Sequence, residues 1–121
     1  MDYEKLCSGI LQVDQKIRFV AVYDKWAKRV AGGAKAGIEN LLPDKVTQES
    51  VNQAIFRWES RKKMSEWVGK PKYSMAEYEK LKRFTFYLNT NDLLLVTTEP
   101  DADHILILTM IQNLLTDPKF S

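Results

Sequence analysis

Cysteine, histidine and long apolar runs are all scarce in this sequence of 121 residues. The single cysteine, Cys7, can form no internal disulfide and belongs to no zinc-ligand spacing. The longest apolar runs, at 93–96 and 105–108, are far shorter than the roughly 20 residues that a membrane-spanning helix needs. The N-terminus carries charges within its apolar stretch and lacks a secretory core. These absences predict a cytoplasmic protein without a transmembrane segment.

Residues that could carry catalysis are equally sparse. His104 is the only histidine, and it lies in the stretch DADH with Asp101 and Asp103. Three residues so close on one helical turn point in different directions, whereas a metal needs three or four converging ligands. No G-x-S-x-G motif is present, and Cys7 has no neighbouring base in the sequence. A carboxylate pair for acid–base chemistry stays open in principle, but no two acids stand out. We therefore expect no catalytic residue, no metal, no cofactor and no enzyme activity.

The glycine-rich stretch AGGAKAG, residues 31–37, resembles a phosphate-binding loop at first sight. A Walker loop requires Lys and then Ser or Thr directly after its second glycine, and Ile38 and Glu39 occupy those positions here. The dinucleotide fingerprint fails too, because its glycine spacing is absent and the stretch follows a predicted hairpin. The glycines are predicted to permit a corner where the chain leaves a sheet, with Lys35 exposed on it.

The net charge of +2 is too small to indicate a nucleic-acid-binding protein by itself. One local concentration of positive charge exists, and it is interleaved with Trp58. A solvated helix face is the favoured interpretation of this cluster, and nucleic-acid binding, which would depend steeply on salt, is the less favoured one. The members of this basic patch are Arg57, Arg61, Lys62 and Lys63.

The chain length and its content of 45% hydrophobic and 28% charged residues fit one globular domain, residues 1–121. Apolar spacing predicts a helix over 2–13, capped by Asp2. β-branched and aromatic residues predict an antiparallel hairpin of strands 17–24 and 26–33, with its turn near Lys25 and Trp26. A single helical turn is expected over 37–42.

A longer helix is predicted from Thr47, as N-cap, to about residue 66. Its apolar stripe comprises Val51, Ala54, Ile55 and Trp58, with Ser65 and Val68 as further candidates. Phe56, Met64 and Trp67 lie on other sides of this helix, so we expect a second face of the helix to be buried as well. This face packs either against a second copy of the chain or, as the less favoured alternative, under the GKPK loop at 69–72 of the same chain.

The remaining sequence predicts three strands and a closing helix. The segments YSMAEY, KRFTFYL and LLLVTTE read as strands between 73 and 99, with a turn at 89–92. The stretch at 100–103 reads as a helix start with acids in its first turn, and the helix ends before Pro118. The fold class is thus α+β: a five-stranded antiparallel sheet flanked by helices, in the order α-β-β-α-β-β-β-α.

This order, together with FVAVYD and RVAGG before a central helix and YLNTNDLLLVTTEPDADH before the last helix, resembles the roadblock domain. Roadblock and longin folds are relatives of profilin. The phrases KIRFVAVYD, GKPKYSMAEYEKLKRFTFYL and LLLVTTEPDADH also look like those of a group of small archaeal proteins. The sequence departs from the family at the first hairpin, where Trp26 and Ala27 stand in place of a glycine or asparagine turn.

The resemblance implies a non-enzymatic homodimer that regulates a small GTPase or serves as a scaffold. In roadblock dimers the central helix packs against its copy and sheet edges can meet. By position, this role falls on residues 48–66, and Trp67 directly follows them. The expected interface residues are Gln53, Phe56, Arg57, Ser60, Met64 and Trp67.

A different class of function is a small-molecule sensor of the profilin or PAS type. A sensor needs a cavity with a few converging polar groups, whereas a scaffold fills its core with side chains. The large aromatic and aliphatic residues expected in the core, such as Phe84, Phe86 and Leu95, favour the scaffold. No membrane partner is expected.

Overall fold

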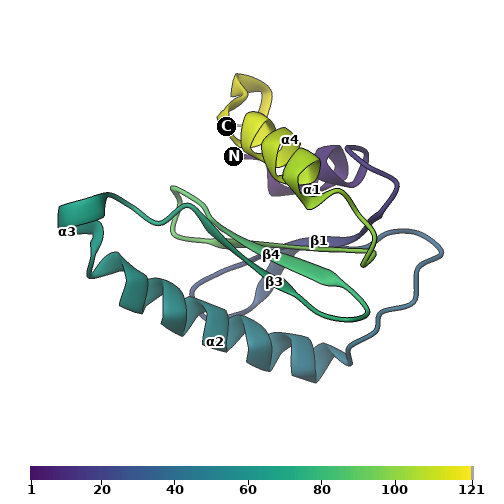
Figure 1. Cartoon of the computed structure of the whole chain (residues 1–121), viewed down its shortest axis with the longest axis horizontal. Coiled ribbons are helices and arrows are strands. Elements are labelled where there is room, and N and C mark those ends of the chain that lie inside the picture. The colour runs from purple at the N-terminus through teal and green to yellow at the C-terminus, as the bar shows by residue number, and fades with distance from the viewer. Residues whose placement is uncertain (121) are drawn as a thin grey trace.

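A computed structural model of the chain describes residues 1–120 and has the predicted α+β architecture. Figure 1 shows a twisted sheet with α1 and α4 on one face and α2 crossing the other. No helix in the described range is long and apolar enough to cross a membrane. The elements are α1 (Tyr3–Leu11), β1 (Ile17–Tyr23), β2 (Arg29–Ala34), α2 (Asp44–Lys62), α3 (Ser65–Val68), β3 (Tyr73–Glu77), β4 (Lys82–Tyr87), β5 (Leu93–Thr98), α4 (His104–Thr116) and a short 3₁₀ helix (Pro118–Phe120).

The sheet has the order β2-β1-β5-β4-β3, and every neighbouring pair is antiparallel. The N-terminal hairpin and the three C-terminal strands therefore meet at the centre, where Tyr23 pairs with Leu93 and Val22 with Leu94. The two edges are β2 and β3. The predicted five-stranded antiparallel sheet and the predicted element order are both confirmed.

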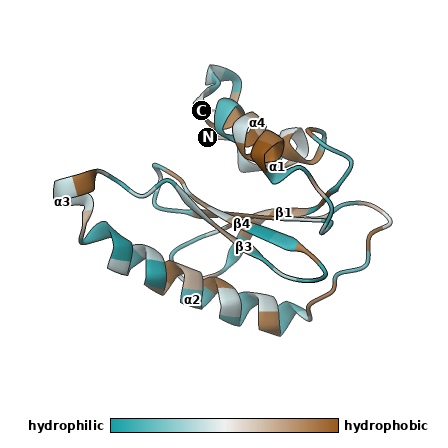
Figure 2. Cartoon of the chain, in the orientation of Figure 1, coloured by the Kyte–Doolittle hydropathy of each residue, from teal (hydrophilic) through white to brown (hydrophobic). Residues whose placement is uncertain are grey.

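Alternate strand residues face two separate cores, as the pleat of a strand requires. On the α1/α4 face, Phe84 and Phe86 of β4 pack with Ile107 and Ile111 of α4, all fully or almost fully buried. Hydropathy colouring in Figure 2 shows that α4 is strongly apolar, whereas α2 carries apolar residues only at intervals along a mostly polar helix. The core under α2 is correspondingly smaller.

The first hairpin departs from the prediction, because β2 begins at Arg29 and not at residue 26. Trp26 and Ala27 belong to the turn, in which Ala27 has a positive φ of 60°. The Asp24 Oδ1 atom accepts hydrogen bonds from the amides of Trp26 (2.9 Å) and Lys28 (3.0 Å). These two bonds hold the turn without the glycine or asparagine that such a conformation favours.

Gly32 and Gly33 lie within β2, as the predicted strand 26–33 places them. The corner predicted for AGGAKAG is therefore limited to the residues after Ala34, where the chain leaves the sheet. Gly32 has φ +85°, and a Cβ atom there would lie 2.1 Å from the carbonyl oxygen of Val20. Glycine thus permits a close approach of two paired strands. Lys35 is half-buried, and its Nζ donates to the carbonyl of Gln15 at 3.2 Å.

Three of the predicted helices also need correction. No helix forms over 37–42, where the chain makes turns and bends. The central helix starts at Asp44 after Pro43 rather than at Thr47, and it ends at Lys62, so that Ser65 and Val68 belong to α3. The last helix starts at His104. Asp103 precedes it as N-cap and accepts from the amide of Leu106 at 3.1 Å, so the acids of 100–103 lie outside the first turn.

Candidate functional site

The structure places every residue of the predicted interface on the solvent side of α2 and α3. Gln53, Phe56, Arg57 and Ser60 of α2, Met64 between the helices and Trp67 of α3 are all exposed. We define the α2–α3 face by the four large apolar side chains that it displays. Their exposed fractions are 76% for Phe56, 55% for Met64, 77% for Trp67 and 78% for Val68.

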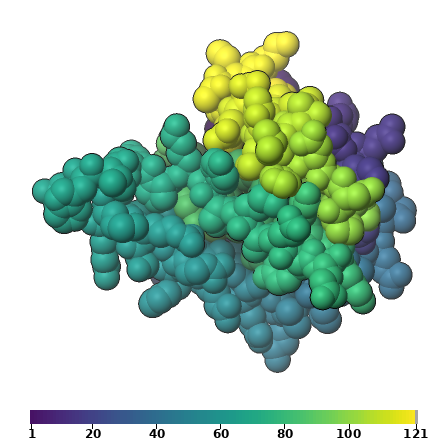
Figure 3. Space-filling model, in the orientation of Figure 1, coloured from purple at the N-terminus to yellow at the C-terminus, as the bar shows by residue number. Residues whose placement is uncertain are grey.

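The GKPK loop does not cover these residues. Phe56 and Trp67 are both about three-quarters exposed, so the alternative in which they fold under residues 69–72 of the same chain is wrong. Val68 lies on this surface too and not in the buried stripe predicted for it. In Figure 3 the C-terminal end of α2 and α3 project from the body of the molecule. This projection makes them accessible to a second molecule.

The opposite side of α2 rests on the sheet through Val51, Ala54 and Trp58, as the predicted stripe requires. The Trp58 ring stacks on Tyr87 of β4, with centroids 4.7 Å apart and an interplanar angle of 12°. The Lys62 ammonium lies 4.4 Å from the centroid of the Trp58 ring. Aromatic stacking thereby anchors the C-terminal half of the helix.

The predicted basic patch is divided between two environments. Arg61 is half-buried and donates from Nη1 to the Tyr87 hydroxyl at 2.6 Å. Lys62 bonds Glu59 at 3.0 Å and, as described, covers Trp58. Arg57 and Lys63 stay exposed. Two of the four side chains are therefore engaged within the chain, but Lys62 alone of the four has its charge compensated by an acid within the described residues.

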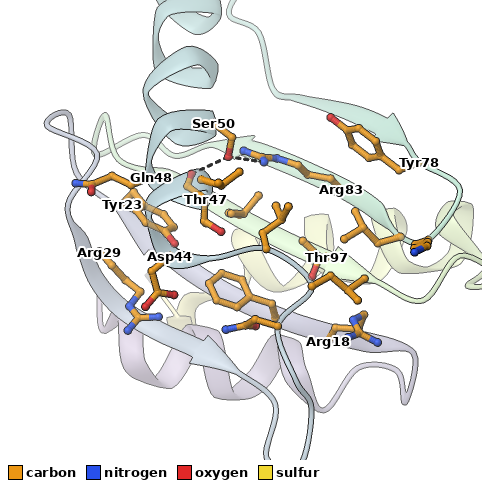
Figure 4. A pocket seen from close by; sticks show the side chains of 18 of the residues that line it. Arg18, Tyr23, Arg29, Asp44, Thr47, Gln48, Ser50, Tyr78, Arg83 and Thr97 are labelled. Atoms are coloured by element: carbon orange, nitrogen blue, oxygen red, sulfur yellow. Dashed lines mark hydrogen bonds between the residues drawn. The ribbon is translucent and has the colours of Figure 1, made fainter.

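A cavity of about 790 Å³ separates the first turns of α2 from the sheet. Its floor includes Phe19 of β1 and Leu95 of β5, and its roof includes Leu41, Leu42 and Val46 from the segment that enters α2. Figure 4 shows polar side chains reaching into this space from α2 and from the strands below.

The sequence did not reveal this cavity, because the aromatic residues expected to fill the core are on the other side. Phe84 and Phe86 pack in the α1/α4 core, while Arg83 and Thr85 of the same strand face α2. Leu95 alone of the three expected residues lies on the α2 side. The alternation in KRFTFY was the available signal, since it gives β4 a polar face that a helix must cover.

Arg83 is the most unusual group of the cavity wall, because only 8% of it is exposed. Its Nη1 donates to Ser50 Oγ of α2 at 2.7 Å, and Ser50 in turn donates to the carbonyl of Thr47 at 2.7 Å (Figure 4). Its Nη2 is buried and has no hydrogen-bond acceptor anywhere in residues 1–120. Leaving a buried charged donor without an acceptor costs roughly 1–3 kcal/mol or more.

No carboxylate compensates this buried charge, since none of the ion pairs formed in residues 1–120 includes Arg83. Burial lowers the pKa of Arg83; Tyr78 raises this pKa, and the positive charge of Arg57 lowers it. A guanidinium nevertheless keeps its proton at neutral pH. The cavity wall therefore carries a fixed positive charge.

His104 and Cys7 make contacts within the fold and do not belong to a cluster of catalytic or metal-binding side chains in residues 1–120. The Lys82 Nζ lies 2.9 Å from His104 Nδ1 and donates to the carbonyl of Ala102 at 2.7 Å. Cys7 is buried, and its burial raises the pKa of the thiol to about 12. Within residues 1–120, no cluster of three His, Cys, Asp or Glu side chains could hold a metal ion.

Solved structures of the same fold cover almost the whole chain. A roadblock/LC7 domain from Streptomyces avermitilis has a TM-score of 0.68 at 14% identity, over 95% of this chain and 92% of that one. The gliding protein MglB from Thermus thermophilus has 0.73 at 8% identity, over 93% and 82%. MglB from Myxococcus xanthus has 0.70 at 11% identity, over 95% and 89%. The predicted roadblock-type fold is confirmed.

Similarity in sequence is more limited. No curated protein matches this chain. The likeness to archaeal proteins stays a prediction. A family model of unknown function matches residues 1–117, nearly the full length. The chain, a roadblock-type domain in structure, belongs by its sequence to the family DUF6659.

Proposed function

We propose that this protein is a non-enzymatic interaction module, and that it works as a homodimer whose copies meet on the α2–α3 face. The observation that carries the proposal is the exposure of four large apolar side chains, Phe56, Met64, Trp67 and Val68, within the C-terminal half of α2 and in α3 with the residue before it. Soluble monomers rarely expose a contiguous apolar patch of large side chains, and such patches mark interaction sites.

The position of β3 at the edge of the sheet supports a dimer interface on the same surface. β3 is an edge of the sheet, so one side of its backbone has no strand partner. An unpaired edge is a template for another strand. α2 and α3 connect directly to β3 through residues 69–72. A second copy that packs on the helices can thus reach the edge strand as well, as the resemblance to roadblock dimers implies.

The dimer would present its remaining surface to a protein partner. From the resemblance to roadblock domains, we expect this partner to be a small GTPase or a member of a scaffolded complex. One solved MglB structure of the same fold is described as having a tetrameric arrangement, at a TM-score of 0.73 and 9% identity. That description supports self-association of this fold.

Light scattering after size exclusion, at low and at tens of micromolar protein, tests the dimer. We expect a dimer for the natural chain and a monomer for Phe56→Arg, because a charge would be buried in the interface. Ile105→Arg is the matched control, since Ile105 is 70% exposed on α4, on the opposite face of the sheet from α2 (Figure 1), and should leave the dimer intact. A natural chain that stays monomeric at tens of micromolar refutes the dimer. A dimer unaffected by Phe56→Arg moves the interface elsewhere.

A further inference from the structure

We infer that the cavity under α2 binds a small amphipathic anion, whose acidic group pairs with Arg83 and whose apolar body lies against the sheet. The inference goes beyond the interaction module proposed above, because it concerns a different surface. It does not require the dimer to exist. It rests on three features of the cavity: its size, its apolar floor and roof, and the unpaired guanidinium in its wall.

The volume suits a small molecule. At about 790 Å³ the cavity lies in the range of ligand sites, which is roughly 300–1,000 Å³. Such sites are mostly apolar with a few placed polar groups. The floor residues Phe19 and Leu95 are almost fully buried, and the exposed residues Leu41, Leu42 and Val46 add apolar surface on the side of α2. These surfaces would accept a hydrocarbon or aromatic body.

The unpaired guanidinium selects an anion. Arg83 Nη1 is bound to Ser50, but Nη2 lacks an acceptor in residues 1–120. A carboxylate, sulfonate or phosphate is the natural partner of this arginine, because one of its oxygens would accept a charge-assisted hydrogen bond from the unpaired Nη2. A neutral ligand would leave the charge uncompensated.

The wider charge distribution agrees with this choice. The acids of the wall, Asp44 and Glu79, are both exposed, whereas Arg83 is buried. The first turn of α2 lines the cavity without a side-chain cap on its amides, and the positive end of a helix also favours an anion. The cations of the wall outnumber its acids by five to two, although one of the five, Arg18, is paired with Glu99 outside the wall; they are Arg18, Lys28, Arg29, Lys80 and Arg83.

Two fluorescent probes test the inference, because they share the same rings and differ in charge. Anilinonaphthalene sulfonate carries the anion, and phenylnaphthylamine is its neutral counterpart. We expect the natural chain to bind the sulfonate at least about tenfold more tightly than the neutral probe, as a charge-assisted hydrogen bond implies. Equal affinities, or no binding of the sulfonate, would overturn the inference with the natural chain alone.

Variants then locate the binding. Arg83→Met should remove the preference for the sulfonate and leave the affinity for the neutral probe unchanged. Lys70→Met, the matched loss of one positive charge from an exposed loop, should change neither affinity. Thr97→Trp should fill the cavity and weaken both probes, because Thr97 lies in its wall. Tight sulfonate binding that survives Thr97→Trp or Arg83→Met places the probe elsewhere and refutes the site.

The same titration separates this inference from the proposed dimer. Phe56→Arg should abolish the dimer without changing the affinity for the sulfonate. If the affinity instead rises as the dimer dissociates, then a second copy of the chain occupies the cavity, and the inference of a small ligand is wrong. If the experiments refute only the dimer, the natural chain should still bind the anionic probe more tightly than the neutral one.

Discussion

Replacement of Trp58 by alanine tests how α2 is held on the sheet. Trp58 is 5% exposed, and it contributes the largest side chain that α2 buries. Its ring stacks on the ring of Tyr87, with the two centroids 4.7 Å apart, and the Lys62 ammonium lies 4.4 Å from the centroid of the Trp58 ring. The other buried residues of α2, Val51 and Ala54, are small. Trp58 is therefore the main anchor between the helix and the sheet.

We expect Trp58→Ala to lower the free energy of unfolding by about 3–5 kcal/mol, the usual cost of a buried Trp→Ala change. Roughly 0.5–1.5 kcal/mol of this belongs to the pair with Tyr87 beyond its buried area. A double-mutant cycle with Tyr87→Ala would measure that coupling. Tyr87→Phe keeps the ring and removes the hydroxyl that accepts from Arg61, so we expect it to cost only about 1 kcal/mol.

Urea denaturation, followed by far-ultraviolet circular dichroism at one fixed protein concentration, gives these free energies. Trp26→Ala is the matched control, because Trp26 is 75% exposed and contacts mainly the ammonium of Lys25, 5.3 Å from the centroid of its ring. Its loss should change stability by about 0.5 kcal/mol or less. If Trp58→Ala costs no more than Trp26→Ala, the stacked pair does not anchor α2 and the reasoning fails.

Three further changes test the other core and the hairpin. Gly32→Ala should lower the free energy of unfolding by at least about 2 kcal/mol in the same urea assay, because the new methyl would lie 2.1 Å from the Val20 carbonyl oxygen and the φ of residue 32 is positive. An unchanged stability would show that the two strands can move apart at this position. Cys7 should resist alkylation at pH 8 and react after unfolding, because burial raises the pKa of its thiol to about 12 and the thiolate is the reactive form; rapid labelling of the folded protein would contradict its burial. Asp24→Ala should lower the thermal midpoint and reduce the free energy of unfolding by about 1 kcal/mol, because Asp24 Oδ1 accepts a hydrogen bond from the amide of Lys28 in the turn. An unchanged midpoint would mean that the turn forms equally well without this side chain.

The sequence predicted the strands and their order well, because alternation and turn residues are local signals. Phe84 and Phe86 alternate with Thr85 and Tyr87, and this pattern alone placed β4. The hairpin turn was harder. The acceptor that stabilises it is the side chain of Asp24, and a positive φ at Ala27 has no signature in the sequence.

The cavity could not be predicted because it depends on the distance between two elements far apart in the chain. Arg83 and Ser50 are 33 residues apart, and their hydrogen bond exists only once α2 lies on the sheet. Propensity places Arg83 in a strand but does not say which helix covers it. The exposed residues Phe56 and Trp67 were predictable, since helical spacing puts them away from the stripe that Val51 and Trp58 share.

The pairing of β1 with β5 has a consequence for how the chain folds. Tyr23 and Leu93 pair although about 70 residues separate them, while the other strand pairs join neighbours in sequence. Closing a loop of that length costs about 4 kcal/mol of chain entropy. The hairpin of β1 and β2 and the meander of β3 to β5 can each form locally. The central seam, on which both halves depend, is thus the entropically expensive step, and topology of this kind slows folding relative to helical bundles of equal size.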